Sequence, residues 1–431
     1  TGWHRNNFIL NDMNTKLKLT IASFLEFAVW GAYLTSQGRF LASIGLAEQI
    51  GWFYSIQGIV SIFMPALIGI IADKWIPAQK LLGICHGLAA ILMMATGWYG
   101  LTAETVQFGT IFTLYSFSVA FFMPTIALIN SVSYNALEKA GMDTVKVFPS
   151  IRIWGTIGFI ISMWCVDLMG IQASAYQYIF SGILGLILAG YSFNLTHCPV
   201  SKGGEKKSIV EAMGLKAFAL FKESRMAIFF IFSMLLGVAL QITNSFANPF
   251  LGDFAGIEQY ADTFGVKHSN ILISLSQISE ALCILLIPFF LRRFGIKKVM
   301  LIAMFAWVLR FAFFGLGNPG NGVWLFVLSM LVYGVAFDFF NISGSLFVDR
   351  NTDHSIRSSA QGLFMLMTNG IGAAIGTLGA QAVVNALVNS QTDPIAKMTG
   401  WSHTWFIFAA YALIITIAFA ILFKYKHVPE K

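Results

Sequence analysis

Twelve apolar runs follow one another along the chain, and each is long enough to cross a lipid bilayer. A membrane-spanning helix needs about 20 predominantly apolar residues. Because the bilayer interior offers no water to backbone polar groups, such runs must form helices that satisfy their own hydrogen bonds. The sequence therefore predicts an all-α membrane protein with twelve transmembrane helices in two six-helix halves. The predicted spans are residues 17–43, 48–72, 80–101, 106–132, 148–169, 173–196, 226–251, 268–291, 297–317, 321–347, 357–388 and 399–424.

Composition argues against a soluble protein. Hydrophobic residues make up 57% of the 431 residues and charged residues only 11%, whereas about a quarter of the residues of a soluble domain are charged. The net charge of +7 does not indicate a nucleic-acid-binding protein, because the basic residues are distributed over the ends of the apolar runs. The four cysteines show no metal-site or disulfide-framework spacing, so we expect neither a metal nor another cofactor.

The longest polar segment separates two groups of six spans. We predict an N-terminal half at 13–196, a basic cytoplasmic linker at 197–225 and a C-terminal half with a short tail at 226–431. Residues 1–12 precede a Met-Asn pair typical of a natural start, and we interpret them as an extension of unknown origin. The linker lysines are Lys202, Lys206, Lys207, Lys216 and Lys222.

Positive charge predicts the orientation of the chain in the membrane. If the N-terminus is cytoplasmic, the inner segments hold 22 Lys and Arg, and the outer loops hold three, namely Arg39, Lys267 and Lys397. Cytoplasmic loops carry the excess of positive charge, so we expect both termini in the cytoplasm.

Three ionisable residues of the second half are predicted to lie at one depth. Glu280 and Arg310 each lie twelve residues from a basic residue at the cytoplasmic end of the span, and Asp338 lies twelve residues before Arg350. Twelve helical residues rise about 18 Å, which places all three near the bilayer midplane. Because charges inside a membrane are costly, they default to functional or paired roles. Two alternatives remain for Arg310 and Asp338: a functional role, or a structural ion pair with each other.

Neutral polar and aromatic residues share faces with these charges. Gln241 and Asn244 are three residues apart, as are Gln277 and Glu280, so each pair lies on one helix face. On the tenth span, the residues Tyr333, Phe337, Asp338 and Asn341 follow i, i+4, i+5, i+8 spacing. Amides and carboxylates beside aromatic rings suit a ligand that has hydroxyl groups and a flat ring.

The first half contains three further ionisable residues. Glu26 is predicted either to face a central cavity or to bond a neighbouring helix, and His86 is interpreted as a structural interface histidine in preference to a proton carrier. Arg152 lies two turns deep if its span begins near Asp143, and it reaches the membrane surface if the span begins at Pro149. With Thr156 and Phe159, Arg152 follows i, i+4, i+7 spacing, which predicts one stripe facing the cavity.

Two loops at equivalent places carry charged turns, Gly69–Lys80 after the second span and Phe290–Lys298 after the eighth. Both resemble the short loop signature of the major facilitator superfamily. Within that superfamily, most of the chain from residue 13 to about 427 is similar to the nucleoside:proton symporter family. The segments that carry this resemblance are Phe63–Trp75, Ile151–Phe159, Met226–Gly237, Leu240–Asn244, Ser276–Glu280 and Phe337–Gly344.

The resemblance implies a proton-driven importer of nucleosides, with nucleoside and protons as its partners, in a bacterial inner membrane. Glu26 departs from it, because the resemblance predicts a neutral amide at this position. We expect a monomer that works by alternating access of its two halves. The substrate-binding residues it implies are Arg152, Thr156, Phe159, Gln241, Asn244, Gln277, Glu280, Tyr333 and Phe337.

The proton-coupling candidates are Asp338 and Glu280, with Glu26 and Arg310 as further participants. Removal from water favours the neutral form of a carboxylate, so such a group can load a proton from the outer side. Other functions stay open at this point: transport of another hydroxylated molecule such as a sugar or glycoside, or a sensor that binds without transporting. A membrane enzyme is disfavoured, because no nucleophile–base pair or phosphate-binding loop is evident.

Overall fold

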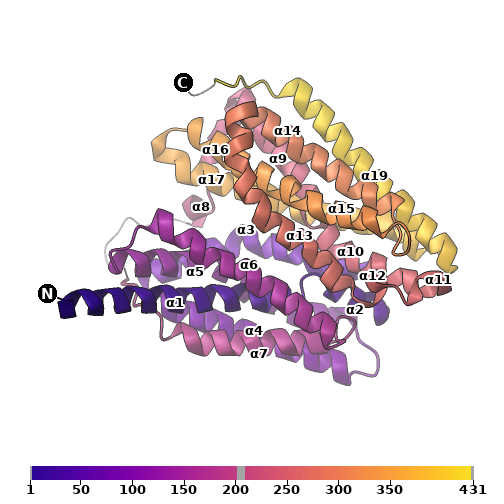
Figure 1. Cartoon of the computed structure of the whole chain (residues 1–431), viewed down its shortest axis with the longest axis horizontal. Coiled ribbons are helices and arrows are strands. Elements are labelled where there is room, and N and C mark those ends of the chain that lie inside the picture. Colours follow the sequence, from indigo (N-terminus) through magenta and orange to yellow (C-terminus); the bar gives the residue numbers. More distant parts are fainter. Residues whose placement is uncertain (1, 201–208, 429–431) are drawn as a thin grey trace. The chain divides into compact units, whose positions relative to one another are not determined.

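The computed structural model describes residues 2–200 and 209–428. Within those residues the secondary structure is helical, and no strand is found (Figure 1). Lys202, Lys206 and Lys207 of the predicted linker lie outside the described residues, as do residues 1 and 429–431.

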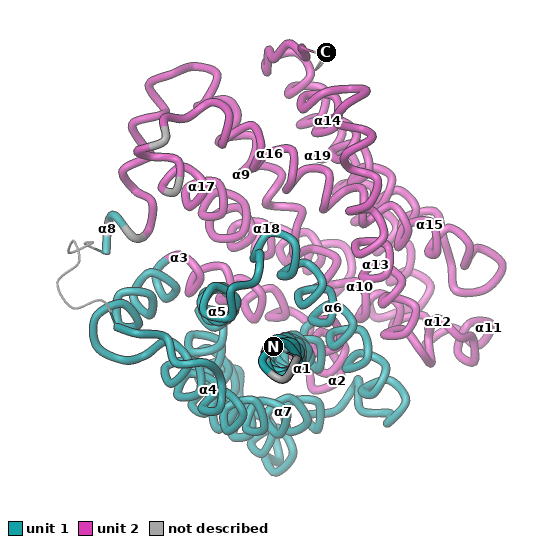
Figure 2. The backbone as a smooth tube through the Cα atoms, turned by 60° about the vertical axis from the view of Figure 1, so that its left-hand side comes forward, with its two compact units in different colours: residues 1–34, 63–212 teal, residues 35–62, 213–431 magenta. Residues whose placement is uncertain are grey.

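The chain forms two compact units (Figure 2). The N-terminal unit comprises residues 1–34 and 63–212, and the C-terminal unit comprises 35–62 and 213–431. The predicted halves differ from these units chiefly in residues 35–62, which group with the C-terminal unit.

The N-terminal unit consists of long helices joined by short turns. Helix α1 packs mainly against α6 and α7, and α4 packs against α5 and α7. Serines join these helices: Ser162 Oγ donates to Ala28 O (2.6 Å) and Ser181 Oγ donates to Val29 O (2.7 Å). Such short hydroxyl contacts allow close helix packing in a membrane. The helices are α1 (Gly2–Gly31), the second part of α3 (Ile50–Lys74), α4 (Ala78–Thr102), α5 (Phe108–Lys139), α6 (Thr144–Leu168), α7 (Tyr176–Ser192) and the short α8 (Ile209–Ala212).

The C-terminal unit contains more breaks within its spans. In this unit α14 packs against α19 and α15, α13 packs against α15, and α9 packs against α18. Its α-helices are α2 (Gln37–Ser43), the first part of α3, α9 (Ser224–Leu240), α10 (Ile242–Asp253), α11 (Glu258–Ala261), α12 (Phe264–Lys267), α13 (Ser269–Cys283), α14 (Ile287–Leu316), α15 (Val323–Gly334), α16 (Phe340–Arg350), α17 (Arg357–Met365), α18 (Ala373–Val384) and α19 (Pro394–Leu422).

Short 3₁₀ and π segments complete this unit. The π-helices are η5 (Val335–Phe339), η7 (Leu366–Gly372) and η8 (Asn385–Asn389). The 3₁₀ turns are η1 (Ala47–Gln49), η2 (Leu215–Lys222), η3 (Phe254–Gly256), η4 (Ile284–Leu286) and η6 (His354–Ile356).

Local sequence signals explain several helix boundaries. Asp143 caps α6 by accepting from Val145 N (3.1 Å), and Asp393 caps α19 by accepting from Ala396 N (3.0 Å). Gly295 has φ 81°, a left-handed conformation that favours glycine, and it divides α14 into two helices at the predicted loop after the eighth span.

All twelve predicted spans coincide with helical segments of the described residues. Nine of the described helical segments are long and apolar enough to cross a membrane, and one of them, Ser269–Leu316, contains two predicted spans. The predicted spans 17–43 and 173–196 are not among the nine. The second corresponds to α7, which has only 17 residues, and the first to α1, which carries Lys16, Lys18 and Glu26. Helix α1 also extends through residues 2–12, so the extension predicted there continues the helix of the first span.

Candidate functional site

Helices α13 and α15 of the C-terminal unit touch at Gly334. A Cβ atom there would lie 2.4 Å from Ser279 O, so no side chain fits without separating the helices. Ser279 Oγ accepts from Gly334 N (3.2 Å) and donates to Leu331 O. Because Glu280 follows Ser279 and Tyr333 precedes Gly334, the contact brings these two side chains within electrostatic reach of each other.

The π-helix η5 continues α15 and carries Asp338. The rings of Tyr333 and Phe337 stack, with their centroids 5.7 Å apart and an interplanar angle of 15°. Asp338 is 4% exposed, and its Oδ2 atom has no hydrogen-bond partner among the described residues. Glu280 is close enough for the two carboxyl groups to interact electrostatically. π-helices within longer helices are frequent at functional sites.

Arg310 on α14 is held by neutral groups. Its Nη1 donates to Ser329 O (2.8 Å) and its Nη2 donates to Thr243 Oγ1 (3.1 Å). The guanidinium carbon lies 4.6 Å from the centroid of the Tyr333 ring, which is a cation–π contact. No ion pair to Asp338 is found in the described part of the chain, so the alternative of a structural Arg310–Asp338 pair is wrong. Arg310 instead uses its donors on oxygens of three other helical segments, α10, α13 and α15.

Two amide side chains lie where the seventh span is interrupted. Gln241 separates α9 from α10, and Asn244 Nδ2 donates to Gln241 Oε1 (2.9 Å), which confirms the shared face predicted for them. Both are half-buried, as are Gln277, Glu280 and Phe337. The C-terminal unit therefore combines carboxylates, amides, a guanidinium and a stacked aromatic pair within its apolar spans.

The predicted stripe of the N-terminal unit lies on α6. This helix begins at Thr144, so Arg152 lies eight residues, or about 12 Å, inside it, and the alternative start at Pro149 is wrong. The Arg152 guanidinium carbon lies 3.9 Å from the centroid of the Phe27 ring, and its Nη1 donates to Thr156 Oγ1 (3.3 Å). Phe159 is buried, with Trp30 edge-on at 6.2 Å.

Glu26 and His86 form a hydrogen-bonded pair. His86 Nε2 contacts Glu26 Oε2, and Thr125 Oγ1 donates to Glu26 Oε1 (2.6 Å). Glu26 is 0% and His86 1% exposed. Of the two alternatives for Glu26, bonding to neighbouring helices is therefore the one observed, and His86 lies between helices as predicted. The pairing of the two side chains with each other was not predicted, although both lie a short distance inside their spans.

Sequence reasoning also missed the neutral partners of the charged groups. Thr243, Ser276 and Ser329 bond Arg310 or carry the carbonyl that does, and Thr125 bonds Glu26. Hydroxyl residues are common in membrane helices, so their positions carried no distinct signal. In the described part of the chain no group of three or more His, Cys, Asp or Glu could hold a metal ion.

A protein-family model described as "Nucleoside H+ symporter" matches residues 13–428. The chain belongs to the nucleoside H+ symporter family. It is therefore a membrane transporter and not an enzyme.

Individual relatives agree with this family assignment. The nucleoside permease NupG of Escherichia coli (strain K12) is 48% identical over 96% of this chain and 97% of its own length. The xanthosine permease of the same organism is 46% identical over 97% of this chain and 98% of its own length. A crystal structure of the nucleoside transporter NupG, 47% identical, matches with a TM-score of 0.87 over 96% of this chain and all of that one. The major facilitator fold predicted for this nucleoside H+ symporter is thus confirmed.

Proposed function

We propose that the chain imports nucleosides together with protons by alternating access. Membership of the symporter family supports this function, and relatives that share nearly half of its residues are a nucleoside permease and a xanthosine permease. The observation that carries the proposal is the pair of neighbouring carboxyl groups, Glu280 and Asp338, beside the stacked rings of Tyr333 and Phe337. The carboxyl groups can accept hydrogen bonds from hydroxyl groups of a nucleoside, and the aromatic rings can stack on its flat base.

Each unit contributes proposed nucleoside contacts. In the C-terminal unit, the ribose hydroxyls donate to Glu280, Gln277 and Asn244, Gln241 orients Asn244, and the base stacks on Tyr333 or Phe337. In the N-terminal unit the proposed contacts are Arg152, Thr156 and Phe159.

Proton coupling is assigned first to Asp338 and Glu280. Two carboxyl groups that share a site disfavour double ionisation, so one of them readily carries a proton. The unpartnered Oδ2 of Asp338 leaves that proton, or a substrate hydroxyl, free to bond there. Arg310 and Arg152 modulate these charges, and Glu26 is a further coupling residue.

The proposed location is a bacterial inner membrane, with both termini cytoplasmic and the protein a monomer. The distribution of Lys and Arg supports the orientation, and the Escherichia coli relatives are consistent with the location. Single cysteines placed in each terminus should react with an impermeant thiol reagent in inside-out vesicles of the inner membrane. They should not react in right-side-out vesicles.

The first test is uptake of radiolabelled uridine and xanthosine by liposomes that contain the purified protein. We expect uptake to rise when the outside is made acidic and to fall when a protonophore is added. If folded protein accumulates no nucleoside under any gradient, the proposed function is wrong.

The Asp338→Asn variant tests the coupling residue. Its accumulation should fall about ten-fold for each pH unit of gradient, the equivalent of one lost proton, while exchange of nucleoside across the membrane stays measurable. The matched control is Asp349→Asn, which removes a half-exposed carboxylate at the end of the same span and should accumulate as the wild type does. Equal accumulation by Asp338→Asn and the wild type would remove Asp338 from the mechanism.

A further inference from the structure

The Glu26–His86 pair joins two helices of the N-terminal unit, α1 and α4, and is completely enclosed. Its partners are few. Thr125 from α5 bonds the second carboxylate oxygen of Glu26, whereas His86 Nδ1 is buried without a hydrogen-bond partner in the described residues. One nitrogen of the imidazole is therefore engaged and the other is open.

The formal charge of the pair depends on one proton. A carboxylate beside a neutral imidazole has a charge of −1, and one added proton makes the pair neutral. An uncompensated charge in a protein interior costs several kcal/mol. No Lys or Arg of the described chain lies within ion-pair distance of Glu26, so a proton is what can neutralise the pair.

Other ionisable groups on the surrounding helices do not replace that proton. Cys85 of α4 interacts electrostatically with Glu26 but brings no positive charge. Arg152, the half-buried cation of α6, is engaged with the Phe27 ring and Thr156. The other buried ionisable side chains of these helices are Tyr115 on α5, Asp167 on α6 and Tyr178 on α7, and Tyr33 is buried just beyond the end of α1.

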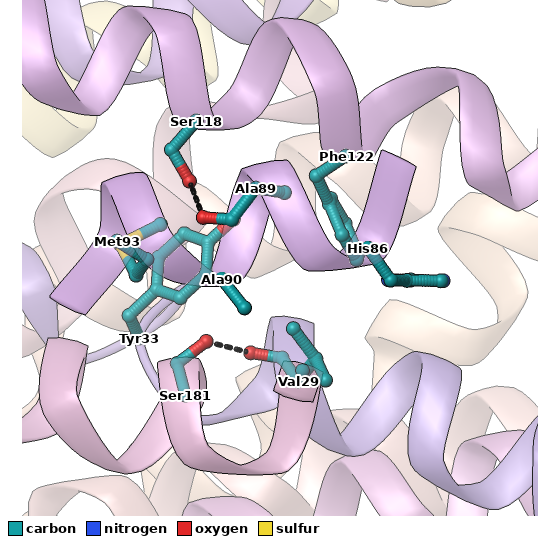
Figure 3. A pocket seen from close by; sticks show the side chains of 10 residues that line it. Val29, Tyr33, His86, Ala89, Ala90, Met93, Ser118, Phe122 and Ser181 are labelled. Carbon is teal, nitrogen blue, oxygen red and sulfur yellow. Dashed lines mark hydrogen bonds between the residues drawn. The ribbon is translucent and has the colours of Figure 1, made fainter. Parts of the chain in front are cut away.

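A small cavity adjoins the pair. It has a volume of about 10 Å³, room for about one water molecule. His86, Phe122, Ser118 and Ser181 are among its lining residues (Figure 3). The two serine hydroxyls donate to the carbonyls of Ala89 and Val29 and retain lone pairs that can accept from water.

A chain of ring contacts connects the pair to the proposed substrate stripe. The His86 ring lies 5.9 Å from Phe122, Phe122 lies 6.1 Å from Trp30, and Trp30 lies 6.2 Å from Phe159. Phe27, which follows Glu26 in the sequence, packs with its ring against the guanidinium group of Arg152. Closely packed side chains transmit small displacements because they cannot compress. A change of charge at the Glu26–His86 pair can therefore alter the positions of Phe159 and Arg152, two of the proposed substrate contacts.

From these contacts we infer that Glu26 and His86 together bind a second transported proton, in addition to the proton carried by Asp338 or Glu280. The inference rests on the proposed function and adds a second coupling site to it. In the enclosed state the pair holds its proton, and it releases the proton when water reaches it in another state of the transport cycle.

The test is the dependence of nucleoside accumulation on the imposed pH difference. Liposomes with equal potassium on both sides and valinomycin have no membrane potential, so accumulation reports the number of protons alone. Two coupled protons give about a hundred-fold rise in accumulation per pH unit and one proton gives about ten-fold. We expect two for the wild type and one for Glu26→Gln, whose amide still bonds Thr125 and His86.

Two variants complete the experiment. Ser118→Ala lines the same cavity without an ionisable group and should keep the wild-type slope. If Glu26→Gln does not fold, the double variant Glu26→Gln/His86→Asn preserves a neutral hydrogen-bonded pair and should also show one proton. A slope of one proton for the wild type, or an unchanged slope in the Glu26 variants, would overturn the inference. A wild type with no gradient-driven uptake at all would instead refute the proposed function.

Discussion

The two units differ in the partners that they provide for their buried ionisable side chains. In the N-terminal unit, Glu26 is matched by His86 and Thr125, and both carboxylate oxygens have partners. In the C-terminal unit, Asp338 is buried with one oxygen unpartnered and a second carboxylate, Glu280, nearby. The buried cation Arg310 of that unit bonds neutral oxygens instead of Asp338.

The carboxylate of Glu26 is already hydrogen-bonded within the protein, whereas Asp338 still has an oxygen available to a ligand. A buried carboxylate whose two oxygens are both hydrogen-bonded has little to gain from a polar ligand, whereas an unbonded buried oxygen has a desolvation cost that a ligand or a proton removes. Asp338 is therefore the stronger candidate for direct contact with substrate. The Glu26–His86 pair is suited to holding a proton away from the substrate.

The largest expected effect comes from removing one member of each arrangement. His86→Leu leaves the Glu26 carboxylate buried without its main partner and should destabilise the protein by about 3–5 kcal/mol. Asp338→Leu removes a buried carboxyl group that has one unpartnered oxygen and a second carboxyl group nearby, so stability should stay equal or rise. The measurement is the midpoint of thermal unfolding in detergent for both variants and the wild type. If Asp338→Leu is the more destabilised of the two, the contrast between the units is wrong.

Depth counting predicted part of this contrast. Counting twelve residues from a basic helix end placed Glu280, Arg310 and Asp338 together, and the structure brings them around Tyr333. Depth counting left open whether Arg310 and Asp338 form an ion pair, because residue counting gives height along a span and not direction around it. Direction depends on helix type, and the π-helix η5 alters it at Asp338.

The same counting was available for the pair that was missed. Glu26 lies eight residues after Lys18, and His86 lies six after Lys80, so both are a similar distance from the basic ends of their spans. What the sequence lacks is the adjacency of α1 and α4 around these residues, which arises from packing across several helices. The neighbouring hydroxyls could not be chosen from sequence for the same reason.

A smaller effect should follow from filling the close contact between α13 and α15 at Gly334, next to the proposed substrate-binding residues Tyr333 and Glu280. Gly334→Ala forces a methyl group against Ser279 O at 2.4 Å, and overpacking of this kind costs about 1–3 kcal/mol. The matched control is Gly379→Ala on α18, where a Cβ atom meets nothing within 4 Å. This control should keep or slightly raise stability, because alanine favours helix by up to about 1 kcal/mol over glycine. Thermal unfolding of both variants, with nucleoside binding as a second readout, separates them; equal stability would show that α13 and α15 tolerate separation.

The smallest effect concerns a buried group outside the spans, where pH acts directly. Burial raises the pKa of the Cys198 thiol, while Lys139 and a backbone hydrogen bond to Gln79 lower it in part. In a variant that keeps Cys198 as its single cysteine, alkylation should rise at a higher pH than for an ordinary thiol. Lys139→Gln should raise the pKa further and slow alkylation several-fold near neutral pH, because the lysine charge favours the thiolate.

The sign of the accompanying stability change is fixed by the same shift. Folding raises the pKa of this thiol, so the folded state favours its neutral form. The resulting stabilisation is fully present below the pKa that the thiol has in the unfolded chain, and it is lost as pH rises through the higher pKa of the folded state. Faster alkylation in Lys139→Gln than in the parent would contradict this reasoning. The experiment thus extends the comparison of the two units to Cys198, a buried group whose nearby cation, Lys139, only partly offsets the effect of burial on its pKa.

The π-helix η5 has a consequence for how this family can change over time. A π turn accommodates one residue more than an α turn of the same length, so η5 (Val335–Phe339) is a place where the tenth span can lose a residue and remain a continuous helix. Because the π turn holds its extra residue over nearly the same rotation as an α turn, such a deletion would leave the side chains before and after it on their original faces. Lineages could thereby change or lose the groups within the turn itself, Asp338 among them, through a single codon deletion, without rotating the rest of the span.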